Sequence, residues 1–234
     1  FLMLFSGALK STLFPEISGV SARNDPQAAA DLVEQSLVYG GLFLIPGVVG
    51  GGILGERILR IYGPEFTQGA LVLFVLVVAN LFMGYQNQIL SALEAVDRPE
   101  LSFRVNVVFV VGNISLNVAL IYQYGWLGAA VATAVSVALS LLLAFRYLSG
   151  VITVETPVWE ISRQWVAALT MGGLVYAALL AESTYRLVQH NVLTVVSLVG
   201  LGAGVYFVTL LALSRRFRTT VDRNLPVDVP YLSR

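Results

Sequence analysis

The side chains that could do chemistry in this sequence are few, and they lie inside long apolar stretches. Asn113 and Asn117 are four residues apart and therefore share one face of a helix. Asn80 and Asn87 precede them, and Arg104 lies between the two pairs. Amide and guanidinium groups suit the hydroxyl and phosphate oxygens of a polar, anionic substrate. These five residues are our candidates for lining a substrate cavity.

Two other roles are open for the same side chains. An amide in hydrocarbon needs a hydrogen-bonding partner, so Asn113 and Asn117 must face either protein or a water-filled cavity. If they face protein, they form hydrogen bonds between helices and are not part of a substrate path. Arg104 lies about one turn inside its apolar stretch, where it can extend to the headgroups instead of meeting a substrate. The residue types leave these alternatives open.

Catalytic chemistry is not indicated. The sequence has no cysteine and a single histidine, His190, which excludes thiolate chemistry and a histidine-rich metal site. It contains no Walker loop, no His-Glu-x-x-His and no Gly-x-Ser-x-Gly motif. We therefore predict that the protein is not an enzyme, and we predict neither a cofactor nor a metal ion.

The composition is that of an integral membrane protein. Hydrophobic residues make up 57% of the chain, charged residues 12%, and the mean hydropathy is +0.79. A soluble domain carries about 25% charged residues, and fewer cannot cover a core of this size with a solvated shell. The 14 Lys and Arg balance the 14 Asp and Glu, which argues against a nucleic-acid partner.

The apolar stretches are long enough to be membrane helices, which need about 20 residues to cross about 30 Å of hydrocarbon. The uncharged block 105–145 is too long for one span, and Gln123-Tyr124-Gly125 divides it into a hairpin. The sequence predicts an all-α, polytopic transmembrane bundle with one partial span and six complete ones, at 1–14, 36–55, 69–92, 105–122, 126–145, 164–181 and 187–214.

The basic residues predict the orientation, because cytoplasmic loops carry an excess of Lys and Arg. Eleven of them fall on one side, in 10–34, 94–104, 146–163 and 215–234, and three fall on the other. The side with eleven is predicted to be cytoplasmic. The protein would then be a multi-pass protein of the cytoplasmic (plasma) membrane with 215–234 as a cytoplasmic tail.

The second span and its approach carry strong backbone signals. Asp25-Pro26 is a helix-start signal, and 27–35 is expected to form a short helix before the span. Inside the span are a proline and three glycines, at Pro46, Gly50, Gly51 and Gly52. Proline bends a helix, and glycine lets another backbone approach closely. These residues therefore indicate either a hinge or tight helix packing.

The order of several motifs resembles a known family. Leu-Phe-Pro-Glu-Ile-Ser at 13–18 closes a span, and Gly-Glu-Arg-Ile-Leu-Arg-Ile-Tyr-Gly-Pro-Glu-Phe at 55–66 separates two others. The run from Asn113 to Ile121 then leads through Tyr124-Gly125 into Gly-Ala-Ala-Val-Ala-Thr at 128–133. Over roughly residues 1–150, the chain resembles the second half of a polysaccharide-unit flippase of the Wzx or RfbX type, in the MOP exporter superfamily.

The resemblance implies a transporter of two lobes around a central cavity, with this chain as its C-terminal lobe. We therefore expect the chain to be a fragment that begins after a missing N-terminal lobe. Such transporters flip lipid-linked oligosaccharides across the cytoplasmic membrane by alternating access, for polysaccharide or glycan biosynthesis. The implied partners are an oligosaccharide on a polyprenyl phosphate or pyrophosphate, the bilayer and the N-terminal lobe. One departure is that the span centres hold no basic residue, and Arg104 comes nearest.

Two further functions are compatible with the sequence. A drug/cation antiporter of the same superfamily would share the topology, but it would need a coupling carboxylate inside a span. A non-transporting membrane subunit of a glycan assembly complex would need no cavity.

Overall fold

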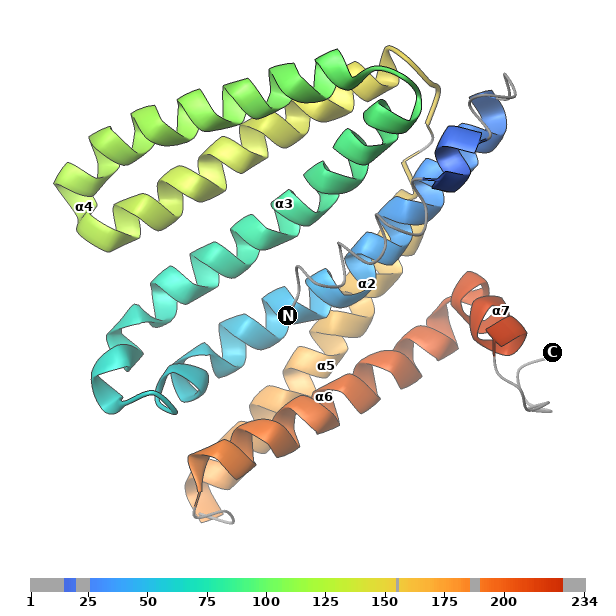
Figure 1. Ribbon diagram of the computed structural model, residues 1–234. Helices are drawn as coiled ribbons and strands as arrows, with labels where there is room; N and C mark the ends of the chain where they lie inside the picture. The colour runs from blue at the N-terminus through green and yellow to red at the C-terminus, as the bar shows by residue number, and fades with distance from the viewer. Residues whose placement is uncertain (1–14, 20–25, 155, 186–189, 225–234) are drawn as a thin grey trace. The chain divides into compact units, whose positions relative to one another are not determined.

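The computed structural model describes residues 15–19, 26–154, 156–185 and 190–224. Within these ranges all regular structure is helical, and the predicted all-α fold is confirmed. The elements are α2 (Pro26–Leu59), the 3-10 helix η1 (Pro64–Gly69), α3 (Ala70–Ala95), α4 (Pro99–Ser149), α5 (Val158–Tyr185), α6 (Asn191–Leu213) and α7 (Arg215–Asn224) (Figure 1). Five of these segments, η1 counted with α3, are long and apolar enough to cross a membrane.

The first helix of this series is longer than the predicted span. α2 begins at Pro26 and continues without a break for 34 residues. The short helix expected over 27–35 is therefore the first part of the same helix that contains the predicted span 36–55. The predicted partial span, 1–14, lies outside the described residues.

The helix labelled α4 consists of two antiparallel arms. A straight helix of its 51 residues would be about 77 Å long, more than twice the thickness of the bilayer hydrocarbon. At Gly125 the chain reverses, with φ 56° and ψ −136° (Figure 1). This positive φ favours glycine, and it confirms the turn predicted at Gln123-Tyr124-Gly125.

The two arms of α4, 99–124 and 126–149, meet with little space between their backbones. A Cβ atom added to Gly128 would lie only 2.1 Å from the carbonyl oxygen of Leu120. Small residues then recur at every fourth position along the second arm, and all of them are buried: Gly128, Ala132, Ser136, Ser140 and Ala144. Small residues let helices approach closely in a membrane, where lipid is as apolar as a leucine side chain.

Glycines also allow α2 to pack closely against α3, here against side chains. Added Cβ atoms at Gly51 and Gly52 would lie 3.4 Å from the Val77 side chain and 3.1 Å from the Phe74 ring, respectively. Side chains of α3 therefore occupy the space that larger residues of α2 would need. Gly50 differs, because an added Cβ there would meet nothing within 4 Å.

A tight turn joins α3 to α4. The Arg98 N–H donates to the Leu93 carbonyl at 2.9 Å, and the Asp97 N–H donates to the Glu94 carbonyl at 3.2 Å. With Asp97 at φ 59°, this pattern is a Schellman motif, which satisfies the last carbonyls of α3. Pro99 then starts α4 at the first helical position.

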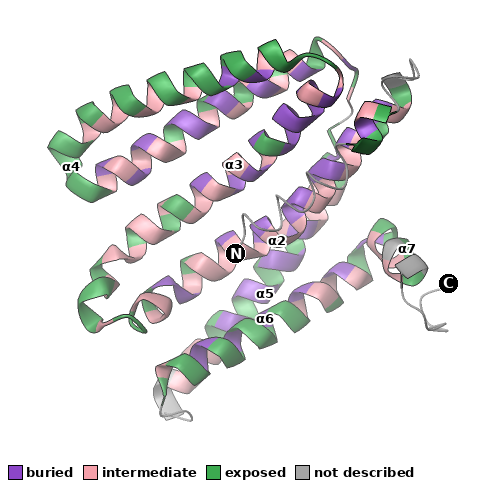
Figure 2. Cartoon of the chain, in the orientation of Figure 1, coloured by how far each residue is buried: buried purple, intermediate pink, exposed green. Residues whose placement is uncertain are grey.

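The buried core of residues 1–157 gathers at one end of these helices. It joins the first half of α2 to the last turns of α3, the beginning of the first arm of α4 and the end of the second arm. Its fully buried members include Val33, Leu93, Val105, Ala144 and Leu148. Figure 2 shows buried residues along the end of α3 and the second arm of α4, whereas the first arm is largely exposed. Polytopic membrane proteins keep such apolar surface for lipid or for further protein.

By its contacts the chain forms two compact units, Phe1–Pro157 and Val158–Arg234. In the second unit α5 packs against α6, and Gly202 gives the close contact: an added Cβ would lie 3.1 Å from Val175. α7 follows α6 directly after Ser214. The sequence predicted only a tail over 215–234, and the helix within it is a finding of the structure.

Gly128→Ala should lower the free energy of unfolding by about 2–3 kcal/mol, because the added methyl group collides with backbone that cannot move without separating the arms of α4. Thermal unfolding of the purified chain in detergent measures this loss. Gly204→Ala is the matched control: nothing lies within 4 Å of its added Cβ, so it should be neutral or stabilising. An equal loss in both variants would contradict the close approach at Gly128.

Candidate functional site

The paired amides of α4 form a hydrogen-bonded group between its arms. Asn117 Nδ2 donates to the Asn113 carbonyl at 2.8 Å and to Asn113 Oδ1 at 3.1 Å. Asn113 Nδ2 in turn lies 3.4 Å from Thr133 Oγ1 on the second arm. Asn113, Asn117 and Thr133 are all partly buried. The structure therefore brings these two candidates together and gives their amides partners within the protein.

Asn80 and Asn87 lie on α3, seven residues apart and therefore on one face of that helix. Asn80 is partly exposed, and its Nδ2 donates to the Leu76 carbonyl at 2.9 Å. Asn87 is exposed. Between them they place two amides, two turns apart, on the accessible side of α3.

Arg104 does not join the amides of its own helix. It precedes Asn113 by nine residues, which is two and a half turns, so the two side chains project from opposite sides of the first arm. Arg104 is exposed, and its neighbours on that side include exposed Val108 and Val111. The five candidates thus occupy three separate helix faces.

The hinge candidates divide into two kinds. Gly51 and Gly52 contact α3, which favours the packing interpretation for these two residues. Gly50 has open space beside it, and Pro46 lies inside α2, where it supplies no backbone N–H. Gly50 and Pro46 are the positions at which a hinge remains a prediction.

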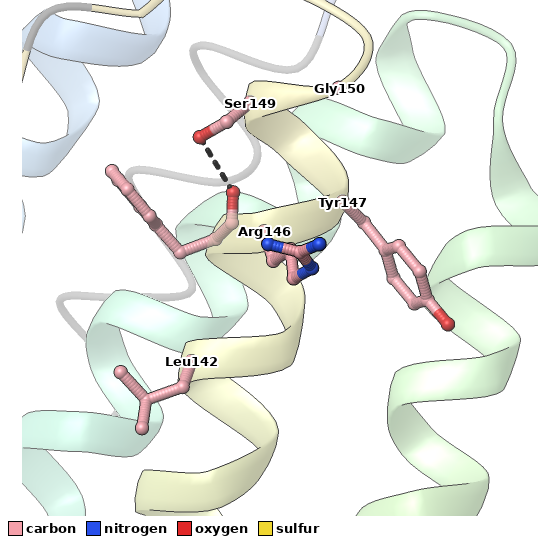
Figure 3. A pocket seen from close by; sticks show the side chains of 6 residues that line it. Leu142, Arg146, Tyr147, Ser149 and Gly150 are labelled. Carbon is pink, nitrogen blue, oxygen red and sulfur yellow. Dashed lines mark hydrogen bonds between the residues drawn. The ribbon is translucent and has the colours of Figure 1, made fainter.

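An open pocket of about 580 Å³ lies at the end of the second arm of α4 (Figure 3). Its lining residues are Leu142, Phe145, Arg146, Tyr147, Ser149 and Gly150. Arg146 is exposed and supplies the positive charge, while Leu142 and Phe145 supply apolar surface. The Ser149 hydroxyl donates to the Phe145 carbonyl at 2.9 Å, within the same helix. This combination suits an amphiphile with an anionic head.

Arg146 is not among the site residues predicted from the sequence, where it counts only toward the orientation. A signal was available, because Arg146-Tyr147 places a guanidinium and a phenol at the end of an apolar span. Within the described residues, no group of three or more His, Asp or Glu side chains is placed to hold a metal ion.

The long apolar helices, the hairpin of α4 and the close glycine contacts define a multi-pass membrane protein. The fold matches a structure of the lipid II flippase MurJ in an inward closed conformation, with a TM-score of 0.71 and 17% sequence identity. The match covers 95% of this chain and 44% of the MurJ chain. The model of the lipid II flippase MurJ family matches residues 2–199, so the chain belongs to that family.

Two proteins of Haloferax volcanii are similar over nearly the whole chain. The probable flippase AglR is 35% identical over 228 residues, which are 96% of this chain and 47% of AglR. The probable low-salt glycan biosynthesis flippase Agl15 is 32% identical over 234 residues, 97% of this chain and 47% of Agl15. The probable lipid II flippase MurJ of Vibrio cholerae is 34% identical over 121 residues, 49% of this chain and 23% of that protein. The chain thus spans about half the length of the first two relatives.

Asn113 and Thr133 should behave as a coupled pair in unfolding experiments. Asn113→Leu and Thr133→Val should each cost about 0.5–1.5 kcal/mol, and the double variant should cost less than their sum, because one bond between the arms is lost in all three. Thermal unfolding of the four proteins gives the coupling. Asn87→Leu, on an exposed position, is the control and should change the unfolding free energy by about 0.5 kcal/mol or less. Strict additivity would mean that the two side chains do not bond.

Proposed function

We propose that this chain forms half of a flippase that moves lipid-linked oligosaccharides across the cytoplasmic membrane by alternating access. The proposal is carried by membership of the MurJ family over residues 2–199. Agl15, which is similar over 97% of this chain, is named as a flippase of glycan biosynthesis. Because such relatives are about twice as long as this chain, a complete transporter of this design would use a second lobe.

The proposed substrate is an oligosaccharide on polyprenyl phosphate or pyrophosphate, for surface polysaccharide or glycan assembly as in the Wzx or RfbX type. The name of Agl15, a probable low-salt glycan biosynthesis flippase that matches 97% of this chain, supports a glycan. Lipid II is the second candidate, because the matching family is described by that substrate. Both carry an anionic head on a long apolar chain, so both pose the same problem of binding charge beside lipid.

The basic pocket at the end of α4 is the proposed binding site for the anionic head. A phosphate or pyrophosphate can accept hydrogen bonds from the guanidinium of Arg146. The apolar surface of Leu142 and Phe145 lies beside it, where the first part of the lipid chain would follow. We place this end of α4 on the cytoplasmic side, together with the C-terminus, because most of the basic residues of the chain gather on that side.

The amide side chains have different proposed roles. Asn80 and Asn87 share the accessible face of α3 and are the better candidates for contact with the glycan. Asn113 and Asn117 already bond within α4, so any part they take in a cavity would be through their partly exposed edges. Arg104 projects from the opposite side of the first arm and would act separately, at the headgroups or at a lobe interface.

A drug/cation antiporter is less well supported. The acidic side chains of helices α2 to α6 lie toward helix ends, as Glu56, Glu94 and Glu182 do, and coupling carboxylates commonly lie within the membrane. A non-transporting subunit has no specific observation in its favour.

Arg146→Gln should slow flipping at least tenfold, because losing a charge-assisted hydrogen bond to a phosphate removes about 1.5–3 kcal/mol of binding. The test uses the full-length protein in vesicles that contain a lipid-linked oligosaccharide in one set and lipid II in another. Flipping is followed by the access of a membrane-impermeant lectin or glycosidase to the head.

Arg60→Gln is the control for this variant, since Arg60 is also exposed but lies at the other end of the helices and pairs with Glu56. Its flipping rate should stay near that of the wild type. Wild-type rates for Arg146→Gln would refute the pocket but leave the function standing. No flipping of either lipid by the wild-type protein would refute the function itself.

Gly50→Ala tests the hinge. The added methyl group meets open space, while alanine favours the helix by about 1 kcal/mol, so α2 becomes stiffer without repacking. If bending at this point is part of alternating access, flipping should slow severalfold while thermal stability stays equal or rises. Gly204→Ala makes the same chemical change at an open position of α6 and should leave flipping unchanged. Equal rates for both variants and the wild type would exclude a hinge at Gly50.

A further inference from the structure

The short helix α7 is strongly basic. Its ten residues include four arginines and one aspartate, a net charge of +3 from four minus one. Phe217 and Val221 lie four residues apart on one side and are partly buried, while Arg215 and Arg216 are exposed. α7 is therefore a short amphipathic helix with basic flanks.

A buried serine fixes the start of α7 to the rest of the second unit. Ser214 is 1% exposed, and its hydroxyl oxygen accepts a hydrogen bond from the Phe217 N–H at 3.0 Å. The same hydroxyl donates to Glu160 Oε2 at 2.7 Å, and Glu160 also pairs with Arg163. Ser214 thus acts as the N-cap of α7 and ties it to the first turn of α5.

A stacked aromatic pair sets the depth of α7 relative to the membrane span. The Phe217 ring stacks on Phe207 of α6, with 6.1 Å between centroids and 17° between ring planes. Phe207 lies six residues before the end of α6 at Leu213, which is about 9 Å back along the helix axis. α7 therefore folds back beside the end of a membrane span instead of extending into water, and its arginines stay close to that end.

We propose that α7 is a docking surface for anionic phospholipid headgroups. The partner is a bilayer lipid because the helix is held at the end of a span, where phosphates of the bilayer lie. Clusters of four or more basic residues directly after a span bind anionic lipids, each residue contributing roughly a fivefold gain in affinity. Phe217 and Val221 lie on the apolar side, and the exposed Arg215 and Arg216 reach the phosphates from its flank. Glu160 and Ser214 are positioning residues that hold the helix at this depth.

The test measures lipid binding by the full chain, purified in detergent. Because the sequence has no cysteine, Thr219→Cys offers a unique site for a fluorescent label on an exposed position of α7. Titration with phosphatidylglycerol should give saturable binding, whereas phosphatidylcholine should give none at the same concentrations. The double variant Arg215→Gln/Arg216→Gln should bind about thirtyfold more weakly, and 0.5 M salt should have a similar effect on the wild type.

Two further variants distinguish lipid binding at α7 from general electrostatic attraction between basic residues and anionic lipid. Arg57→Gln/Arg60→Gln removes the same charge near the end of α2 and should leave the binding constant unchanged. Phe217→Ala keeps every arginine but removes the aromatic stack, so it should weaken binding severalfold with little change in thermal unfolding. Equal binding of the two lipids, equal losses in the two arginine double variants, or wild-type binding by Phe217→Ala would each overturn the proposal. None of these results depends on whether the protein flips a lipid.

Discussion

The close approach of helix backbones is the constraint on which this structure depends. Lipid competes with apolar side chains on equal terms, so membrane helices associate through tight van der Waals contact rather than through the hydrophobic effect. Gly128 against Leu120, Gly52 against Phe74 and Gly202 against Val175 are contacts of this kind. They bring together the arms of α4, then α2 and α3, then α5 and α6. Other large apolar side chains, among them Phe103, Val118 and Leu142, remain exposed, where they meet lipid or other protein.

Close packing also decides what the polar side chains do. Because the arms of α4 are in contact, Asn113 lies beside Thr133, and its amide bonds within the protein. Asn87 is exposed because α3 turns that face away from its neighbours. The positive charge of Arg146 lies at a helix end, where a guanidinium keeps contact with water and headgroups at little cost. The accessible polar face of α3 and the basic pocket of α4 therefore lie in different parts of the first unit.

In the second unit, polar and charged side chains at helix ends hold α5, α6 and α7 together. Ser214 at the end of α6 donates to Glu160 at the beginning of α5, and Glu160 also pairs with Arg163 of its own helix. The same serine caps α7. A hydroxyl that both donates and accepts is well suited to a corner where two helices end, because each end leaves unpaired backbone groups. The chain belongs to a family of membrane flippases, and in such a protein these helix ends lie at the boundary between bilayer and water.

The sequence by itself determined the membrane class, the all-helical fold and the reversal at Gly125. Apolar length and the need to pair every backbone group leave only helices to cross a bilayer in such a chain, and a 41-residue uncharged block must fold back. The helix start at Pro26 was also readable, because proline suits the first turn of a helix. Only the tertiary structure decided which polar groups are used in packing, since residues spaced alike on a helix differ in what lies opposite. Asn113 and Asn80 have the same chemistry, but one faces Thr133 and the other does not. The structure also set the position of α7, because it depends on contacts between separated segments, Glu160 with Ser214 and Phe207 with Phe217.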